Sequence, residues 1–118
     1  MRLTIVQLAV FVTDWRRLNL TDEDLQSLEQ LLIVRPDAGP VIPGTGGFRK
    51  VRFAPPSWRS GKSGSARVIY AHFPEIQAIV LFLIYGKREQ ANLTAQQKHA
   101  ARTWIAGFKR KLATRRSN

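Results

Sequence analysis

The stretch from Gly44 to Glu89 contains three runs of strand-forming residues, Phe48-Arg-Lys-Val-Arg-Phe53, Arg67-Val-Ile-Tyr70 and Ala78-Ile-Val-Leu-Phe-Leu-Ile84. Each run is rich in β-branched or aromatic residues, which is typical of strands. They predict strands over residues 48–54, 66–73 and 78–85. Because only Pro74-Glu-Ile-Gln77 joins the last two, we expect an antiparallel hairpin there. The last run is apolar at every position, which predicts a central strand covered on both faces by this chain, or on one face by a partner.

Basic residues concentrate in the same stretch. No acid occurs between residues 38 and 74, where six cations lie: Arg49, Lys50, Arg52, Arg59, Lys62 and Arg67. The whole chain has a net charge of +11; residues 1–37 carry four Lys/Arg against six Asp/Glu, and residues 38–118 carry fifteen against two. This asymmetry indicates a polyanionic partner, namely nucleic acid, an acidic protein or anionic lipid. A basic surface that serves only solubility is the alternative.

Further elements are predicted on both sides of the three strands. Residues 3–9 favour a short first strand, and residues 11–18 favour one or two helical turns. Thr21 is a suitable N-cap for a helix that ends near Arg35, before Pro36.

Thr94 and Gln97 form a capping box that begins a last helix. The expected fold class is α+β: a small antiparallel sheet of about four strands with two N-terminal helices and one C-terminal helix. We expect one domain over residues 1–118, in which residues 114–118 form a basic tail that frays.

Several kinds of chemistry lack the residues that they need. The chain has no cysteine, which excludes thiol catalysis and fits a reducing cytoplasm. His72 and His99 are far apart in sequence, and only Glu75 and Glu89 are acidic beyond residue 37, so we expect no metal site and no cofactor. No apolar run reaches the roughly 18 residues of a membrane span. We therefore expect a cytoplasmic protein with no membrane partner.

A cluster of cations forms the remaining candidate site. Alternation along the strand at residues 48–54 puts Lys50 and Arg52 on one face. Arg67 begins the neighbouring strand, and Lys87-Arg88 follows the last strand. Because strand ends in one sheet lie close together, we expect these side chains to converge.

Such a cluster is suited to metal-independent cleavage of RNA. That reaction needs a base for the 2′-hydroxyl, stabilisation of the phosphate charge, and an acid for the 5′-oxygen. Arginine matches the phosphate oxygens. Lys50 is a candidate base or acid, and Tyr70 or Tyr85 could transfer a proton or stack on a nucleobase. A basic groove that performs no chemistry explains the same residues equally well.

The ordered motifs resemble the RelE/ParE superfamily of bacterial toxins, and within it the HigB/RelE-like branch. The resemblance covers most of the chain and rests on four strings: Gly44-Thr-Gly-Gly-Phe-Arg-Lys-Val-Arg-Phe53, Gly61-Lys-Ser-Gly-Ser-Ala-Arg-Val-Ile-Tyr70, Leu83-Ile-Tyr-Gly-Lys-Arg-Glu89 and Leu93-Thr-Ala-Gln-Gln97. It implies the toxin of a type II toxin–antitoxin system, in this branch usually an mRNA endonuclease that acts in the ribosomal A site. It also implies an antitoxin partner with a helix-turn-helix DNA-binding domain.

The resemblance also implies roles for individual residues. The family's site of cations on the second, third and fourth strands maps onto Lys50, Arg52, Arg67 and Arg88, with Lys87 beside the last. RelE-type enzymes carry a tyrosine some residues beyond the final arginine, and residues 90–95 contain none. Either Tyr85, Tyr70 or Glu89 takes its role, or this branch uses only cations.

The residues of the basic stretch that are expected to contact RNA are Arg49, Trp58, Arg59, Lys62 and Tyr70. Two alternative functions remain. The ParE arm of the superfamily inhibits DNA gyrase and cleaves no RNA, and a basic nucleic-acid-binding module would have no catalytic activity.

Overall fold

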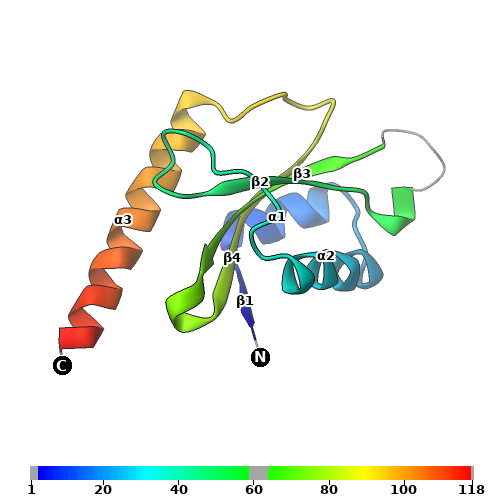
Figure 1. Cartoon of the computed structure of the whole chain (residues 1–118). Coiled ribbons are helices and arrows are strands. Elements are labelled where there is room, and N and C mark those ends of the chain that lie inside the picture. The colour runs from blue at the N-terminus through cyan, green and yellow to red at the C-terminus, as the bar shows by residue number, and fades with distance from the viewer. Residues whose placement is uncertain (1–2, 59–63, 118) are drawn as a thin grey trace.

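The computed structural model describes residues 3–58 and 64–117, with side chains through Arg115. Figure 1 shows the order of the elements along the chain. They are β1 (Thr4–Gln7), α1 (Ala9–Arg17), α2 (Asp22–Val34), β2 (Arg49–Phe53), the 3-10 turn η1 (Pro56–Trp58), β3 (Ala66–Phe73), the 3-10 turn η2 (Pro74–Ile76), β4 (Ala78–Gly86) and α3 (Ala95–Ser117).

The four strands form one sheet in the order β1-β4-β3-β2. The pairs β2–β3 and β3–β4 are antiparallel, so the predicted hairpin is confirmed. The α+β class and the four strands are also confirmed, but β1 runs parallel to β4, with Thr4 opposite Ala78. The prediction of a wholly antiparallel sheet was therefore wrong in this strand. Parallel pairing needs a long crossover, and the helices and strands between β1 and β4 supply it.

Helices cover both faces of the sheet. Figure 1 shows α1 and α2 on one side of the sheet and α3 on the other. The core between α1, α2 and the sheet contains, among others, Phe11, Trp15, Leu28, Leu32, Val68 and Tyr70. The core between α3 and the sheet contains, among others, Phe48, Ile69, Phe82, Leu83, Ala101 and Ile105. Every residue of β4 is buried, which confirms that its unbroken apolar run is covered on both faces.

Capping boxes fix the starts of two helices. Thr21 caps α2, because its side chain accepts from Asp24 N while the Asp24 carboxylate accepts from Thr21 N. At the start of α3, Thr94 Oγ1 accepts from Gln97 N, and Gln97 Oε1 accepts from Thr94 N, each at 3.0 Å. The cap at Thr21 and the capping box of Thr94 and Gln97 are thus confirmed. α3 is helical through Ser117, and fraying of its basic end stays a prediction.

Candidate nucleic-acid interface

Two arginines and a tyrosine form a row across three neighbouring strands. Arg52 on β2 lies directly opposite Arg67 on β3, and Arg67 lies directly opposite Tyr85 on β4. Directly opposite residues project from the same face of a sheet, with Cβ atoms about 4.5–5.5 Å apart. We call these three residues the cross-strand row. It brings together two of the predicted phosphate-binding arginines and one of the candidate tyrosines.

The row lies on the face that α3 covers farther along the sheet. Phe48 packs in the core under α3, so alternation along β2 puts Lys50 and Arg52 on that same face. Arg52 is exposed and Arg67 is half-buried. This end of the face is therefore open to solvent.

A β-bulge at Phe82 puts Tyr85 in the row. Ile69 is opposite Leu83, but the next residue of β3, Tyr70, is opposite Leu81, so Phe82 is one extra residue in β4. Before the bulge, Leu81 packs toward α1 and α2; after it, Leu83 and Tyr85 pack toward α3. If the same residues formed a regular strand without a bulge, alternation from Leu81 would turn Tyr85 to the opposite face.

The hydroxyl of Tyr85 is buried and unpaired within the described part of the chain. The residue is 3% exposed, and its hydroxyl has no hydrogen-bond partner among the residues that the structure describes. Burial raises the pKa of the Tyr85 phenol, and the charge of Arg67 opposes that rise. The phenol is thus protonated at neutral pH and can donate a proton or a hydrogen bond.

Arg67 is oriented by its own strand. Its Nη1 donates to Ser65 Oγ at 3.0 Å and lies 3.4 Å from the carbonyl oxygen of Ala66. Ser65 is 1% exposed, so this support is fixed in the interior. The guanidinium is held in place beside Tyr85, and such an arrangement favours binding of a phosphate.

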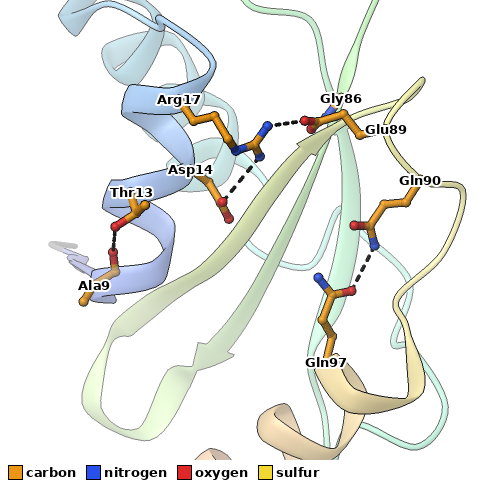
Figure 2. A network of polar contacts seen from close by, with 8 residues as sticks. All are labelled: Ala9, Thr13, Asp14, Arg17, Gly86, Glu89, Gln90 and Gln97. Carbon is orange, nitrogen blue, oxygen red and sulfur yellow. Dashed lines mark hydrogen bonds and ion pairs between the residues drawn. The ribbon is translucent and has the colours of Figure 1, made fainter.

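The turn that carries Lys87 and Arg88 is anchored to the first helix. Glu89 Oε1 accepts from Gly86 N at 2.7 Å, and its other carboxylate oxygen pairs with Arg17 on α1. Figure 2 shows Arg17 reaching from α1 to Glu89 just beyond the end of β4. Burial raises the pKa of Glu89, but the hydrogen bond from Gly86 and the Arg17 contact together lower it below its usual value. Glu89 is therefore an ionised anchor, and it is committed to these partners rather than to proton transfer.

Lys50 lies beside the row on the same face. It is two residues from Arg52 along β2, which corresponds to about 7 Å. Its Nζ donates to Asn92 Oδ1 at 3.3 Å. Lys50 thus links the row to the segment that precedes α3. Asn92 was not among the predicted site residues, because an asparagine shortly before a helix is common and gives no distinct signal in sequence.

Tyr70 lies on the opposite face and is fully buried. Its hydroxyl donates to the carbonyl oxygen of Pro36 at 2.8 Å and accepts from Gly39 N at 3.1 Å. The structure therefore does not bring Tyr70 to the row, and its hydroxyl is occupied by these two backbone partners. Alternation along β3 separates it from Arg67, and its hydroxyl instead fastens the chain after α2 to the sheet.

Two other predicted RNA contacts, Arg49 and Trp58, do not join the row. Arg49 shares the face of Tyr70, where its Nη1 donates to the carbonyl oxygen of Gly39 at 2.7 Å and its Nη2 pairs with Asp37 at 3.6 Å. Trp58 is half-buried and packs against the core under α1 and α2. Arg59 and Lys62 lie outside the described residues.

The described residues contain neither a metal-binding cluster nor a membrane-spanning helix. Within residues 3–58 and 64–117, no three His, Cys, Asp or Glu side chains are grouped so that they could hold a metal ion. Over the same ranges, no helix combines the length and apolar character needed to cross a bilayer.

The fold and the row together define a small α+β protein with an open cationic face suited to phosphates. No protein-family model matches the sequence. The structure is similar to that of an arginine double mutant of the E. coli toxin RelE in the free state, with a TM-score of 0.51. The match covers 76% of this chain and 88% of the RelE chain at 16% sequence identity. The fold is thus RelE-like, as the resemblance implied, and the HigB branch stays a prediction.

Proposed function

We propose that this chain is the toxin of a type II toxin–antitoxin system and cleaves mRNA on the ribosome. The observation that carries the proposal is the buried Tyr85 hydroxyl, which has no partner among the described residues and lies in a row with Arg52 and Arg67. Leaving a buried hydroxyl without a partner destabilises a fold by about 1–3 kcal/mol. A substrate oxygen would supply the missing partner. The RelE-like fold and the net charge of +11 support the same reading.

The reaction is an in-line transesterification of RNA. The 2′-oxygen attacks the neighbouring phosphorus, a P–O2′ bond forms and the P–O5′ bond breaks, which leaves a 2′,3′-cyclic phosphate and a 5′-hydroxyl. Arg52 and Arg67 neutralise the negative charge that develops on the phosphate. Tyr85 gives its proton to the departing 5′-oxygen, and Arg67 lies opposite the resulting phenolate. Lys50 is the candidate base; it takes the 2′-proton as the neutral amine, after its ammonium form has released a proton to solvent.

Lys87 and Arg88 extend the cationic surface next to the row. Both are exposed on the turn that Glu89 anchors, so they are placed to contact the RNA backbone or ribosomal RNA. Contacts of this kind are strongly salt-dependent. We further propose a cytoplasmic protein whose partners are the ribosome, mRNA and an antitoxin with a helix-turn-helix domain that covers the basic face.

The test is induced expression in a bacterium, followed by mapping of mRNA 5′ ends and measurement of translation. We expect cuts associated with codons, and we expect Arg67→Ala to abolish them while the fold is retained. Arg35→Ala is the matched control, because Arg35 is an exposed arginine at the end of α2 and belongs to the other side of the molecule.

Other outcomes would support the alternative functions. Intact mRNA together with blocked DNA supercoiling would indicate a ParE-like gyrase inhibitor. Binding of RNA without toxicity or cleavage would indicate a basic module without catalytic activity. Full toxicity of Arg67→Ala would contradict the assignment of the site.

A further inference from the structure

A preformed groove adjoins the cross-strand row. Its volume is about 320 Å³, at the small end of the range for ligand pockets. It lies between the chain before β2 and the segment that leads into α3. Its lining residues are Pro40, Val41, Ile42, Pro43, Lys50, Asn92, Leu93 and Lys98. None of these described lining residues is acidic.

The groove combines an apolar lining with a few polar groups. The apolar lining comes from Pro40, Val41, Ile42, Pro43 and Leu93, and the positive charge comes from Lys50 and Lys98. A nucleotide matches this composition, since its base buries apolar ring faces and its phosphate attracts cations. An acidic peptide would pair with the two lysines, but its carboxylates would not pack against the apolar lining.

The wall formed by the chain before β2 is held by hydrogen bonds. Ile42 N donates to the carbonyl oxygen of Phe48 at 2.8 Å, and Lys50 N donates to the carbonyl oxygen of Pro40 at 3.1 Å. The buried Thr45 hydroxyl donates to the carbonyl oxygen of Ile42 at 2.8 Å. Nearby, Gly39 lies against β2 so closely that a Cβ there would be 2.5 Å from the carbonyl oxygen of Lys50. This wall therefore needs little reorganisation to receive a ligand.

The wall that carries Asn92 is held as well. Gln90 Nε2 donates to the backbone oxygen of Asn92 at 2.8 Å and to Gln97 Oε1 at 2.9 Å. Figure 2 shows Gln90 pointing to Gln97 at the start of α3. The same Gln97 oxygen takes part in the capping box with Thr94. The loop between β4 and α3 is thus fixed on both sides of Asn92.

The contact with Lys50 decides the orientation of the Asn92 amide. A lysine ammonium only donates, so Asn92 presents Oδ1 to Lys50 Nζ. Nδ2 then points away from Lys50 and is available as a donor. Side-chain amides read nucleobases through such contacts. The geometry suits a base that presents an acceptor atom to Nδ2.

We propose that this groove binds the nucleotide next to the scissile phosphate and that Asn92 determines which base is preferred. The inference rests on the proposed function, because Lys50 lines the groove and is also the candidate base of the proposed reaction. The spacing of about 7 Å between Lys50 and Arg52 along β2 puts the two subsites side by side. Lys98 contacts the phosphate of the bound nucleotide, and the apolar lining of the groove packs against its base.

The test measures binding separately from cleavage. Short single-stranded RNAs that carry 2′-O-methyl groups at every position cannot be cleaved, and a set with each of the four bases reports preference. The full chain and the variants Asn92→Ala and Lys98→Ala are titrated with this set by fluorescence anisotropy. Lys111→Ala is the matched control, since Lys111 is an exposed lysine in the far half of α3.

We expect Lys98→Ala to weaken binding and to reduce the salt slope by about 0.7, as loss of one phosphate contact on a single strand does, and Lys111→Ala to weaken it less. We expect Asn92→Ala to reduce the differences between the four bases. Unchanged affinity and base preference in both groove variants would overturn the inference, as would equal losses in Lys98→Ala and Lys111→Ala.

Failure of the proposed function gives a different result. If wild-type protein cleaves no ribosome-bound mRNA but binds these RNAs with a base preference that depends on Asn92, the groove assignment is supported and the proposed nuclease function is contradicted. If it cleaves mRNA and Asn92→Ala leaves both the cut-site bases and the binding preference unchanged, the nuclease stands and the groove assignment fails.

Discussion

Arg52 and Arg67 lie directly opposite each other on adjacent antiparallel strands. Like charges in this position destabilise a sheet, by up to about 1 kcal/mol. The next residue in the same row is a buried tyrosine hydroxyl that lacks a hydrogen-bond partner among the described residues. Two unfavourable features therefore meet at one place, and a bound phosphate would relieve both. This pattern is expected where stability and activity are in conflict.

Replacing Arg52 should change stability and activity in opposite directions. Arg52→Thr removes the repulsion and suits an exposed strand position, so we expect the melting temperature to rise by roughly 1–4 °C. RNA cleavage should fall at the same time, because a phosphate ligand is lost. Calorimetry and a ribosome-dependent cleavage assay measure the two effects. Arg52→Lys keeps the charge and should leave the melting temperature unchanged; a fall in melting temperature for Arg52→Thr would contradict the reading.

Removing the hydroxyl of Tyr85 should affect activity without weakening the fold. Tyr85→Phe deletes a buried group without a partner in the described chain, so stability in urea should be unchanged or higher by up to about 3 kcal/mol. Loss of an acid should slow single-turnover cleavage by roughly 10²–10⁴-fold. The matched control is Tyr70→Phe, which loses bonds to Pro36 and Gly39 and should lower stability by about 1–3 kcal/mol. Cleavage per folded Tyr70→Phe molecule should be normal. Normal cleavage by Tyr85→Phe together with slow cleavage by Tyr70→Phe would refute the assignment of Tyr85 as the acid.

Asp24 should make stability depend on pH in the acid range. It is fully buried; burial raises its pKa, but hydrogen bonds from Ser57 and Thr21 together lower the pKa below its usual 3.8. The stability that its ionised form contributes is therefore complete above about pH 4. It declines as the pH falls below that value and is absent below the pKa of the folded state.

The variant Asp24→Asn tests this dependence. The free energy of unfolding in urea is measured at a series of pH values between 2 and 7. We expect lower stability at neutral pH and a weaker loss on acidification than in the wild type. Asp22→Asn is the control, since Asp22 is exposed in the same helical turn. Equal acid profiles for wild type and Asp24→Asn would show that another carboxylate is responsible.

The pair of Arg17 and Glu89 should matter more for activity than for stability. Exposed ion pairs contribute about 0–1 kcal/mol, so Glu89→Gln should change the unfolding free energy little. The turn with Lys87 and Arg88 loses its attachment to α1, and amide exchange at Gly86 and Lys87 should become faster. RNA cleavage should decrease as the turn loosens. Glu29→Gln on α2 serves as the control. Unchanged amide exchange in Glu89→Gln would show that the hydrogen bond from Gly86 N holds the turn without the Arg17 pair.

Local patterns in the sequence predicted the elements well. The strand over residues 66–73 matches β3 residue for residue, and the unbroken apolar run 78–84 falls in the strand that is buried on both faces. Both capping residues, Thr21 and Thr94, act as expected. These features depend on neighbours a few positions apart, so the sequence contains the information directly.

Features that depend on distant pairing were not predictable in this way. The direction of β1 follows from which strand it joins after a long crossover, and its own residues do not specify that choice. The choice between Tyr70 and Tyr85 depends on the register of two strands. Alternation correctly predicted that Lys50 and Arg52 share a face, whereas the face of Tyr85 is inverted by one residue that has no marker in the sequence.

The extra residue in β4 has a consequence for comparing relatives of this protein. Phe82 changes the parity of the strand: each side chain beyond it belongs to the opposite layer from the one that simple counting gives. Loss of a single codon there would remove the bulge, and regular alternation would still leave Tyr85 opposite Arg67. A relative that keeps the same number of residues but pairs this strand without a bulge would instead turn its tyrosine toward α1 and α2. A one-residue gap at Phe82 in an alignment is therefore no sign of a lost site, and equal strand length is no proof of a retained one.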